Sequence, residues 1–302
     1  MLDIPALFLI ALIQGITEFL PISSSGHLVL LPQLSDFADQ GQVMDVAAHL
    51  GTLGAVMVYV RRDIWAMLAS LAPRTPAHTS SRRLIGLLII ASLPVILAGL
   101  ALELAGPDFL RLAIVVALAN LVFAVWLWRA DKTDIRHDLT RDGMANSDGA
   151  SSDAANPGQP PTNWPETNWP ETNWQAMSYL HAFFIGLAQI FALIPGASRS
   201  GVTMTMARQL GYDRLSAARF SLLLSVPVIA GAGLLKGVSL YTSQASMDIV
   251  ALIGVAGLSF IFALLAIRWM MGWLARADFR IFVFYRLALG IMLLGLIAAG
   301  RV

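Results

Sequence analysis

Long apolar segments recur along this chain, and they constrain its fold more than any other feature. A run of about 20 apolar residues is long enough to cross the hydrocarbon core of a bilayer as a helix. Six such runs occur, near residues 43–60, 84–104, 110–128, 217–236, 248–271 and 281–299. Charged residues make up 13% of the chain, against about 25% in soluble domains. Because backbone polar groups inside lipid must be satisfied within the chain, we predict an all-α integral membrane protein with six transmembrane helices.

Two polar stretches interrupt the apolar sequence, and they are degenerate copies of one another. One begins at Gln14 and the other at Gln189, and each reads Gln, eight further residues, then Ser-x-Ser-Gly. In both copies an apolar limb runs into a proline, Pro21 or Pro195, which small residues follow. Broken backbone at membrane depth is tolerated only where protein or a water-filled cavity covers it. We therefore expect two re-entrant helix hairpins whose tips form an internal site.

Each hairpin is followed by three apolar segments, which divides the chain into two repeats. The predicted units are residues 1–129, a flexible polar linker over residues 130–175, and residues 176–302. The linker is rich in Asn, Ser, Gly and Pro and carries three Thr-Asn-Trp copies, so it buries too little apolar surface to order itself. Because three is odd, the second repeat is upside down relative to the first, an inverted-topology arrangement.

Basic residues gather in the segments that would lie on one side of the membrane. Arg and Lys occur after the first crossing, in the central linker and near residues 268–280, whereas residues 1–60 contain none. Short loops rich in Arg and Lys stay in the cytoplasm. This bias predicts that the first hairpin enters from outside, the second enters from the cytoplasm, and both chain ends lie outside.

The first hairpin carries a carboxylate at membrane depth. Gln14 and Glu18 are four residues apart and share one face of a helix, and an acidic residue inside a membrane segment is costly and usually functional. Hydroxyls suited to capping the next helix, a glycine and a histidine follow: Ser23, Ser24, Ser25, Gly26 and His27. The amides of a starting helix bind anions, and Gly26 permits close backbone approach.

The second hairpin carries a cation at the matching place. Arg199 lies between Ser198 and Ser200, and Gly201 follows. The planar guanidinium matches phosphate oxygens, although a simple ion pair between Arg199 and Glu18 is the alternative. Together the two tips offer what is needed to bind and cleave a phosphorylated ligand.

A divalent cation is the expected cofactor. Asp45 and His49 lie four residues apart near the outer end of the first crossing. Asp45 would join Glu18 in holding Mg²⁺ or Ca²⁺, since hard cations prefer oxygen ligands, unless it serves only to solvate the interface. The absence of cysteine excludes thiolate ligands.

The two stretches resemble the motifs of the bacterial undecaprenyl-pyrophosphate phosphatases, the family linked to bacitracin resistance. The resemblance implies hydrolysis of a C55 polyprenyl pyrophosphate to the monophosphate in the bacterial cytoplasmic (inner) membrane, with an active site opening to the outer face and a role in cell-wall synthesis. By position, the acidic motif of the family falls on Gln14 and Glu18, its Ser-Gly-His on Ser24 to His27, and its phosphate-binding arginine on Arg199. Many members have Glu where this chain has Gln14, and Asp45 stands where Glu is common.

Three questions stay open at this stage. The attacking group is His27, a serine such as Ser24, or water, with a phosphohistidine on His27 slightly favoured. A prenyl-phosphate transporter is the alternative function, because inverted repeats with broken helices suit it equally. The expected partners are the polyprenyl pyrophosphate lipid and the membrane, with a homodimer left open; a net charge of only +1 indicates no nucleic-acid partner.

Overall fold

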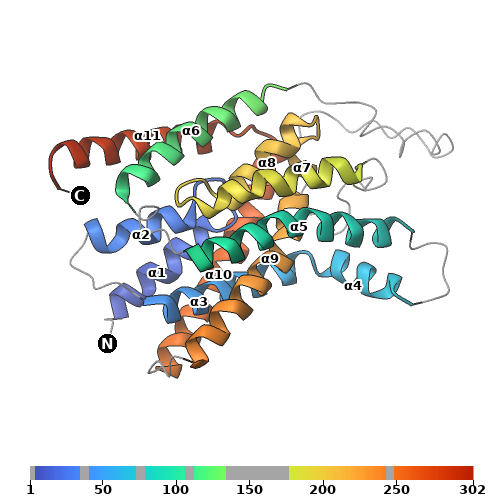
Figure 1. The fold of residues 1–302 in the computed structure, drawn as a ribbon, viewed down its shortest axis with the longest axis horizontal. Helices are drawn as coiled ribbons and strands as arrows, with labels where there is room; N and C mark the ends of the chain where they lie inside the picture. Colours follow the sequence, from blue (N-terminus) through green and yellow to red (C-terminus); the bar gives the residue numbers. More distant parts are fainter. Residues whose placement is uncertain are drawn as a thin grey trace, which may run out of the picture.

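The computed structural model describes residues 4–34, 41–72, 79–105, 112–133, 177–242 and 248–301, and within these ranges its regular structure is helical (Figure 1). The elements are α1 Ile4–Thr17, α2 Ser24–Leu34, α3 Gly41–Tyr59, α4 Arg61–Ser70, α5 Thr79–Ala105, α6 Ala113–Ala130, α7 Tyr179–Ile190, the 3₁₀ turn η4 Phe191–Leu193, α8 Arg199–Gln209, α9 Arg214–Thr242, α10 Ile249–Leu274 and α11 Arg280–Ala298. The all-α prediction is confirmed. Residues 134–175 of the predicted linker lie outside the described residues. The proposed division of the chain into two repeats joined by a linker over residues 130–175 therefore stays a prediction.

The long apolar helices coincide with the predicted crossings. Five of the described helices, α5, α6, α9, α10 and α11, are long and apolar enough to cross a membrane. A sixth candidate is α3 together with α4, a pair bent by 74°. Outward-facing residues such as Val250 and Ile253, 82% and 69% exposed, would be costly in water and are suited to lipid. The chain is a multi-pass membrane protein.

Helix α4 is an element that the sequence reading treated as part of a loop. It begins directly after the kink at Val60, and Asp63 in its first turn forms an ion pair with Arg219 of α9, with Oδ1 and Nη2 2.7 Å apart. Its apolar side chains Trp65 and Leu68 are 70% and 52% exposed. A basic, amphipathic helix with exposed Trp and Leu is typical of a segment lying in the membrane interface.

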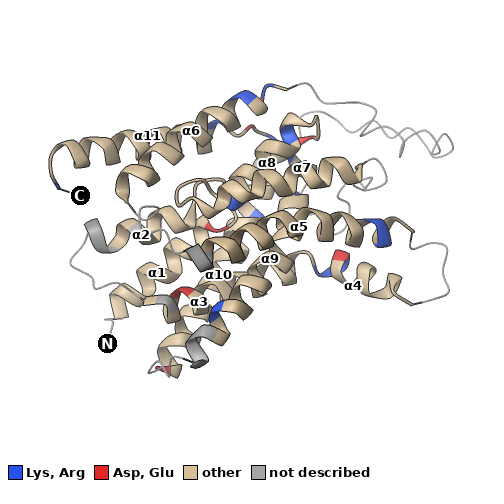
Figure 2. Cartoon of the chain, viewed as in Figure 1, with Lys and Arg blue, Asp and Glu red and all other residues tan. Residues whose placement is uncertain are grey.

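At the two predicted hairpins, two helix pairs enter the molecule from opposite ends (Figure 1), while their re-entrant position in the membrane stays a prediction. Helix α1 runs to the centre and α2 returns to the end where α11 stops; α7 runs to the centre from the end where α6 stops, and α8 returns there. Lys and Arg concentrate toward the end where α6 stops (Figure 2). This arrangement agrees with inverted repeats, while the side of the membrane that each end faces stays a prediction.

Each hairpin packs against a long helix of the other repeat. Helix α1 lies on α10, and α7 lies on α5. Small residues allow both approaches: a Cβ added to Gly15 would lie 2.5 Å from the Cβ of Phe262, and one added to Gly186 would lie 2.5 Å from the carbonyl oxygen of Ala91. Close contact through small residues is the usual way in which membrane helices associate. Because each hairpin packs on a helix of the other repeat, both tips are held in the centre.

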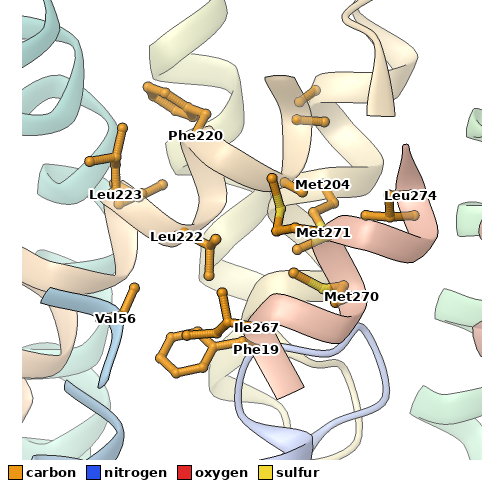
Figure 3. Close-up of a cluster of buried hydrophobic side chains, with 14 of the residues drawn as sticks. Phe19, Val56, Met204, Phe220, Leu222, Leu223, Ile267, Met270, Met271 and Leu274 are labelled. Carbon is orange, nitrogen blue, oxygen red and sulfur yellow. The ribbon is translucent and has the colours of Figure 1, made fainter. Parts of the chain in front are cut away.

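The largest apolar cluster surrounds the first tip. Phe19, 1% exposed, belongs to this cluster together with Ile267 and Met270 of α10, Leu222 of α9 and Met204 of α8 (Figure 3). Inside a membrane the stabilisation of such a cluster comes from close van der Waals packing between the helices. Because Phe19 follows Glu18 directly, the cluster also fixes the position of that carboxylate.

Candidate active site

Both hairpins turn through the same strained backbone conformation. Ser23 and Ser198 have φ angles of 76° and 70°, and they are the only residues other than glycine with positive φ in the described ranges. In each case the serine hydroxyl accepts a hydrogen bond from a first-turn amide of the next helix: Gly26 N lies 3.2 Å from Ser23 Oγ, and Gly201 N lies 3.1 Å from Ser198 Oγ. Left-handed backbone costs about 1–2 kcal/mol at such a residue, and the cap offsets part of it. The repeated sequence pattern therefore produces a repeated turn.

The two tips are joined by direct hydrogen bonds, and we call this junction, residues 20–23 with 196–200, the seam. The amide of Gly196 donates to Ser23 Oγ at 3.1 Å, and Ser200 Oγ donates to the carbonyl oxygen of Leu20 at 2.9 Å. A Cβ added to Gly26 would lie 3.3 Å from the Cα of Gly196, so the close approach expected at this glycine is confirmed.

A buried arginine that the sequence reading missed ties the seam together. Arg286 of α11 is fully buried, and its guanidinium donates to the carbonyl oxygens of Pro21 at 3.3 Å and of Gly196 and Ala197 at 2.9 Å each. Backbone oxygens of both tips thus solvate the cation. The sequence does carry an indication of this role, since Arg286 lies inside an apolar run, and an arginine there is costly and usually has a specific role.

Glu18 lies at the centre of the candidate site, with its side chain 7% exposed. Arg199 Nη2 donates to its Oε1 at 3.0 Å. Its Oε2 accepts from Gln14 Nε2 at 2.9 Å and from Ser24 Oγ at 2.6 Å. The structure therefore brings together the carboxylate of the first hairpin, the hydroxyl next to the first cap and the cation of the second hairpin.

The ion pair with Glu18 engages only one of the three guanidinium nitrogens of Arg199. Its side chain is 12% exposed, and of its nitrogens only Nη2 has a hydrogen-bond partner among the described residues. Nε and Nη1 remain available for an anion. The first-turn amides of α2, at Ser24 and Ser25, have no acceptor within their helix and add the positive end of a helix dipole. Pairing with Glu18 and binding of a phosphate are thus compatible roles for one guanidinium.

His27 points away from Glu18. Its Nδ1 lies 2.6 Å from the carbonyl oxygen of Ser23, and its Nε2 lies 2.6 Å from the hydroxyl of Tyr285 on α11. A carbonyl only accepts, so Nδ1 carries the proton, and in the neutral ring Nε2 accepts from Tyr285. The sequence reading missed Tyr285, which carries no local signal. The described contacts give His27 no route to Glu18, and Ser24 is the hydroxyl beside the carboxylate.

Several residues predicted to bind substrate take part in contacts at the seam, and their binding of substrate stays a prediction. Ser198 and Ser200 are 5% and 1% exposed, their hydroxyl oxygens are 3.1 Å apart, and Gly201 serves as the capped amide. Ser25 is exposed, and its hydroxyl lies 3.4 Å from that of Ser23. Ser25 is therefore the one of these hydroxyls that solvent reaches directly.

The predicted metal ligands do not form a ready-made cage. Within the described ranges, no three His, Cys, Asp or Glu side chains are grouped as a metal site requires. His49 brings Nε2 to 3.8 Å from Glu18 Oε2, and its Nδ1 lies 2.7 Å from the backbone oxygen of Asp45. The contacts described for Glu18 do not include the Asp45 carboxylate. One carboxylate still fits Mg²⁺, which is commonly bound by one or two carboxylates plus substrate phosphates and water.

Fold and site together define a multi-pass membrane protein with a carboxylate, a serine and a guanidinium buried between two helix hairpins. The chain belongs to the BacA family, described as bacitracin resistance protein BacA, which it matches over residues 7–292. It is 44% identical over 295 residues to the undecaprenyl-diphosphatase of Ruegeria pomeroyi, covering 96% of this chain and 97% of that protein. The undecaprenyl-diphosphatases of Maricaulis maris and Alteromonas mediterranea are 42% and 37% identical, over 95% and 97% of this chain and 97% and 98% of theirs. The family membership inferred from the two motifs is confirmed.

Proposed function

We propose that this chain hydrolyses undecaprenyl diphosphate to undecaprenyl phosphate and inorganic phosphate, recycling the lipid carrier for cell-wall synthesis and giving bacitracin resistance. The names of its relatives support this activity. The observation that carries it is the 2.6 Å hydrogen bond from Ser24 Oγ to Glu18 Oε2, with Arg199 on the other carboxylate oxygen. A hydroxyl held on a base beside an anion-binding cation is the arrangement of an activated nucleophile.

In the proposed reaction Ser24 Oγ attacks the terminal phosphorus and Glu18 accepts its proton, while the bond from that phosphorus to the bridging oxygen breaks and undecaprenyl phosphate leaves. Arg199, through Nε and Nη1, and the first-turn amides of α2 hold the phosphoryl oxygens. Phosphoryl transfer depends mainly on positioning and on stabilisation of charge, and the seam fixes the position of these groups. Water then hydrolyses the phosphoserine. His27, engaged by Ser23 and Tyr285, orients the first turn of α2 in this scheme.

A divalent cation, Mg²⁺ or Ca²⁺, would be held by Glu18 together with phosphate oxygens and water. Bound there, it would offset the negative charge of the diphosphate. Hard cations of this kind are suited to carboxylate and phosphate oxygens, and Asp45 would be the second carboxylate to take part.

The substrate would reach the site from the lipid. In this proposal the protein lies in the bacterial inner membrane with the end of α11 outside, as the distribution of Lys and Arg favours. The diphosphate enters from the outer face along the first hairpin, and the prenyl tail stays between lipid-exposed helices. A transporter of prenyl phosphates would use the same architecture, but it has no need of a serine held on a carboxylate.

Phosphate release by the purified protein tests this function directly. We expect release from undecaprenyl diphosphate that a chelator suppresses, and a loss of at least about 100-fold in the Ser24→Ala variant. Ser81→Ala, which removes a hydroxyl at the start of α5, is the matched control and should behave as wild type. Movement of the lipid across vesicles without phosphate release would identify a transporter instead.

A further inference from the structure

A cavity lies where α5 begins beside α7, toward the end of the molecule at which Lys and Arg concentrate (Figure 2). Its volume is about 490 Å³, and it is lined by Thr79, Arg82 and Arg83 of α5 and by Tyr179 of α7. We call it the basic cavity, because its lining holds two guanidinium groups and two hydroxyls but no carboxylate. Guanidinium groups and hydroxyls are the donors that a phosphate group needs. The basic cavity shares no residue with the candidate active site.

Backbone oxygens hold Arg82 in position. Its Nε donates to the carbonyl oxygen of Ser70 at 2.6 Å, and its Nη2 donates to that of Ala72 at 3.0 Å. Carbonyl groups at the end of a helix have no partner within it, so Arg82 also ties the end of α4 to α5. Its Nη1 has no hydrogen-bond partner among the described residues, and the side chain is exposed. The guanidinium is therefore fixed, with one nitrogen able to bind an anion.

Arg83 and Tyr179 form the opposite side of the basic cavity. Arg83 Nη2 donates to the carbonyl oxygen of Met177 at 2.9 Å, and its Cζ lies 5.0 Å from the centre of the Tyr179 ring. The ring packs on Gly86, where an added Cβ would lie 3.2 Å from the Tyr179 hydroxyl oxygen. The phenol is thus held on α5 one turn beyond the two arginines. A binding site whose donors are already fixed loses little entropy when a ligand binds.

The outward face of α4 indicates how deep the basic cavity lies in the membrane. Trp65, Leu68 and Leu71 are 70%, 52% and 67% exposed, and a spacing of three residues keeps them on one side of the helix. Exposed tryptophan is enriched at the level of the lipid headgroups. Because Arg82 binds the end of this helix, the basic cavity lies at the same level, where the phosphate groups of lipids are found.

An apolar surface leads from the basic cavity along α5 and α7. Ile89 and Leu93 follow Arg82 on one face of α5 at helical spacing, and they are 55% and 49% exposed. On α7, which packs along α5, Phe183 and Leu187 are 42% and 37% exposed. Acyl chains can lie against this surface, whereas a free phosphate ion would make no use of it.

We propose that the basic cavity binds the phosphate group of an anionic phospholipid, and that the acyl chains of this lipid lie on the apolar surface of α5 and α7. Arg82 Nη1 and the Tyr179 hydroxyl contact the phosphate oxygens, and Arg83 adds positive charge. Basic pockets between transmembrane helices on the cytoplasmic side are known to bind lipid headgroups, and the distribution of Lys and Arg predicts that side for this end of the chain. The site is independent of the phosphatase reaction.

Native mass spectrometry of the purified protein in detergent tests this site. The protein is titrated with dioleoyl phosphatidylglycerol and with dioleoyl phosphatidylcholine, which differ only in the headgroup. We expect wild type to bind the anionic lipid at least about tenfold more tightly. Arg82→Gln should weaken binding of that lipid about tenfold. Arg61→Gln is the matched control, since Arg61 is an exposed arginine outside the basic cavity, and its affinity should stay within about twofold of wild type.

Two further variants separate binding from folding and from the active site. Tyr179→Phe keeps the ring on Gly86 and removes only the hydroxyl, so it decides the matter if Arg82→Gln does not fold; affinity for phosphatidylglycerol should fall about three- to tenfold. Arg199→Gln removes the cation of the candidate active site and should bind phosphatidylglycerol as wild type does.

Four results would overturn the proposal. The first is equal affinity of wild type for the two lipids, and the second is binding of phosphatidylglycerol that neither Arg82→Gln nor Tyr179→Phe weakens. Loss of that binding in Arg199→Gln would place the lipid in the active site instead. Displacement of the lipid by an excess of inorganic phosphate would identify the basic cavity as a site for the free ion.

Discussion

Arg199→Lys is the substitution that most directly tests how the site binds phosphate. The positive charge is kept, but the planar fork is lost. In the structure one guanidinium nitrogen, Nη2, holds Glu18 at 3.0 Å, while Nε and Nη1 have no hydrogen-bond partner among the described residues and can contact the ligand. A lysine ammonium at the end of its stem is a single point that cannot hold the carboxylate and two phosphate oxygens in fixed directions.

The expected loss follows from the contacts that disappear. Hydrogen bonds to charged groups contribute about 1.5–3 kcal/mol each, and lysine would retain one of the two that Arg199 can make to the phosphoryl group, with poorer alignment. Loss of about 3 kcal/mol of transition-state stabilisation corresponds to roughly a hundredfold decrease in kcat/KM.

The assay is phosphate release from undecaprenyl diphosphate by protein purified in detergent. Arg61→Lys is the matched control, because Arg61 is exposed and donates only to the carbonyl oxygen of Val58 among its described partners. The control should stay within error of wild type. If kcat/KM of the Arg199→Lys enzyme lies within about threefold of the wild-type value, or about 0.7 kcal/mol, the guanidinium does not bind the phosphate through two nitrogens.

Three further experiments probe the carboxylate, the seam and the topology. Glu18→Gln should abolish phosphate release, because an amide does not accept the serine proton, and it should weaken Mg²⁺ binding measured by calorimetry, because the negative charge is lost; unchanged Mg²⁺ binding would place the ion elsewhere. Arg286→Met leaves three carbonyl oxygens of the seam unsatisfied, at a cost of about 1–3 kcal/mol each. Thermal unfolding followed by tryptophan fluorescence should therefore show a midpoint several degrees lower. An unchanged midpoint would contradict the stabilising role of Arg286 at the seam. In this chain, which contains no cysteine, a cysteine at Ala299 should react with an impermeant thiol reagent in spheroplasts and one at Ala275 should not; the opposite pattern would reverse the orientation.

The features that could be predicted from sequence are those set by local chemistry or by the solvent. Apolar runs of spanning length became helices because lipid leaves the backbone no other partner. The two Ser-x-Ser-Gly copies became identical turns because each serine caps the helix that follows it. Glu18 and Arg199 came together because each occupies the tip of one of these hairpins.

The features that escaped prediction depend on partners far away in the chain. His27 is the attacking group that the motif slightly favours, yet its ring contacts Tyr285, 258 residues further on. His49 was noted only for its spacing from Asp45, and nothing local reveals that α3 carries it to Glu18. Helix α4 was missed because its basic residues resemble a loop, while its ion pair to α9 is a tertiary contact.

The seam has a consequence for motion. A transporter built from inverted repeats moves substrate by rocking one repeat against the other, which opens the central site alternately to each face. Here the guanidinium of Arg286 binds carbonyl oxygens of both tips in a buried setting, so rocking at the centre would strip a cation of its only described solvation. An alternating-access cycle would have to break these contacts first, so the two tips are expected to stay joined while substrate binds and products leave.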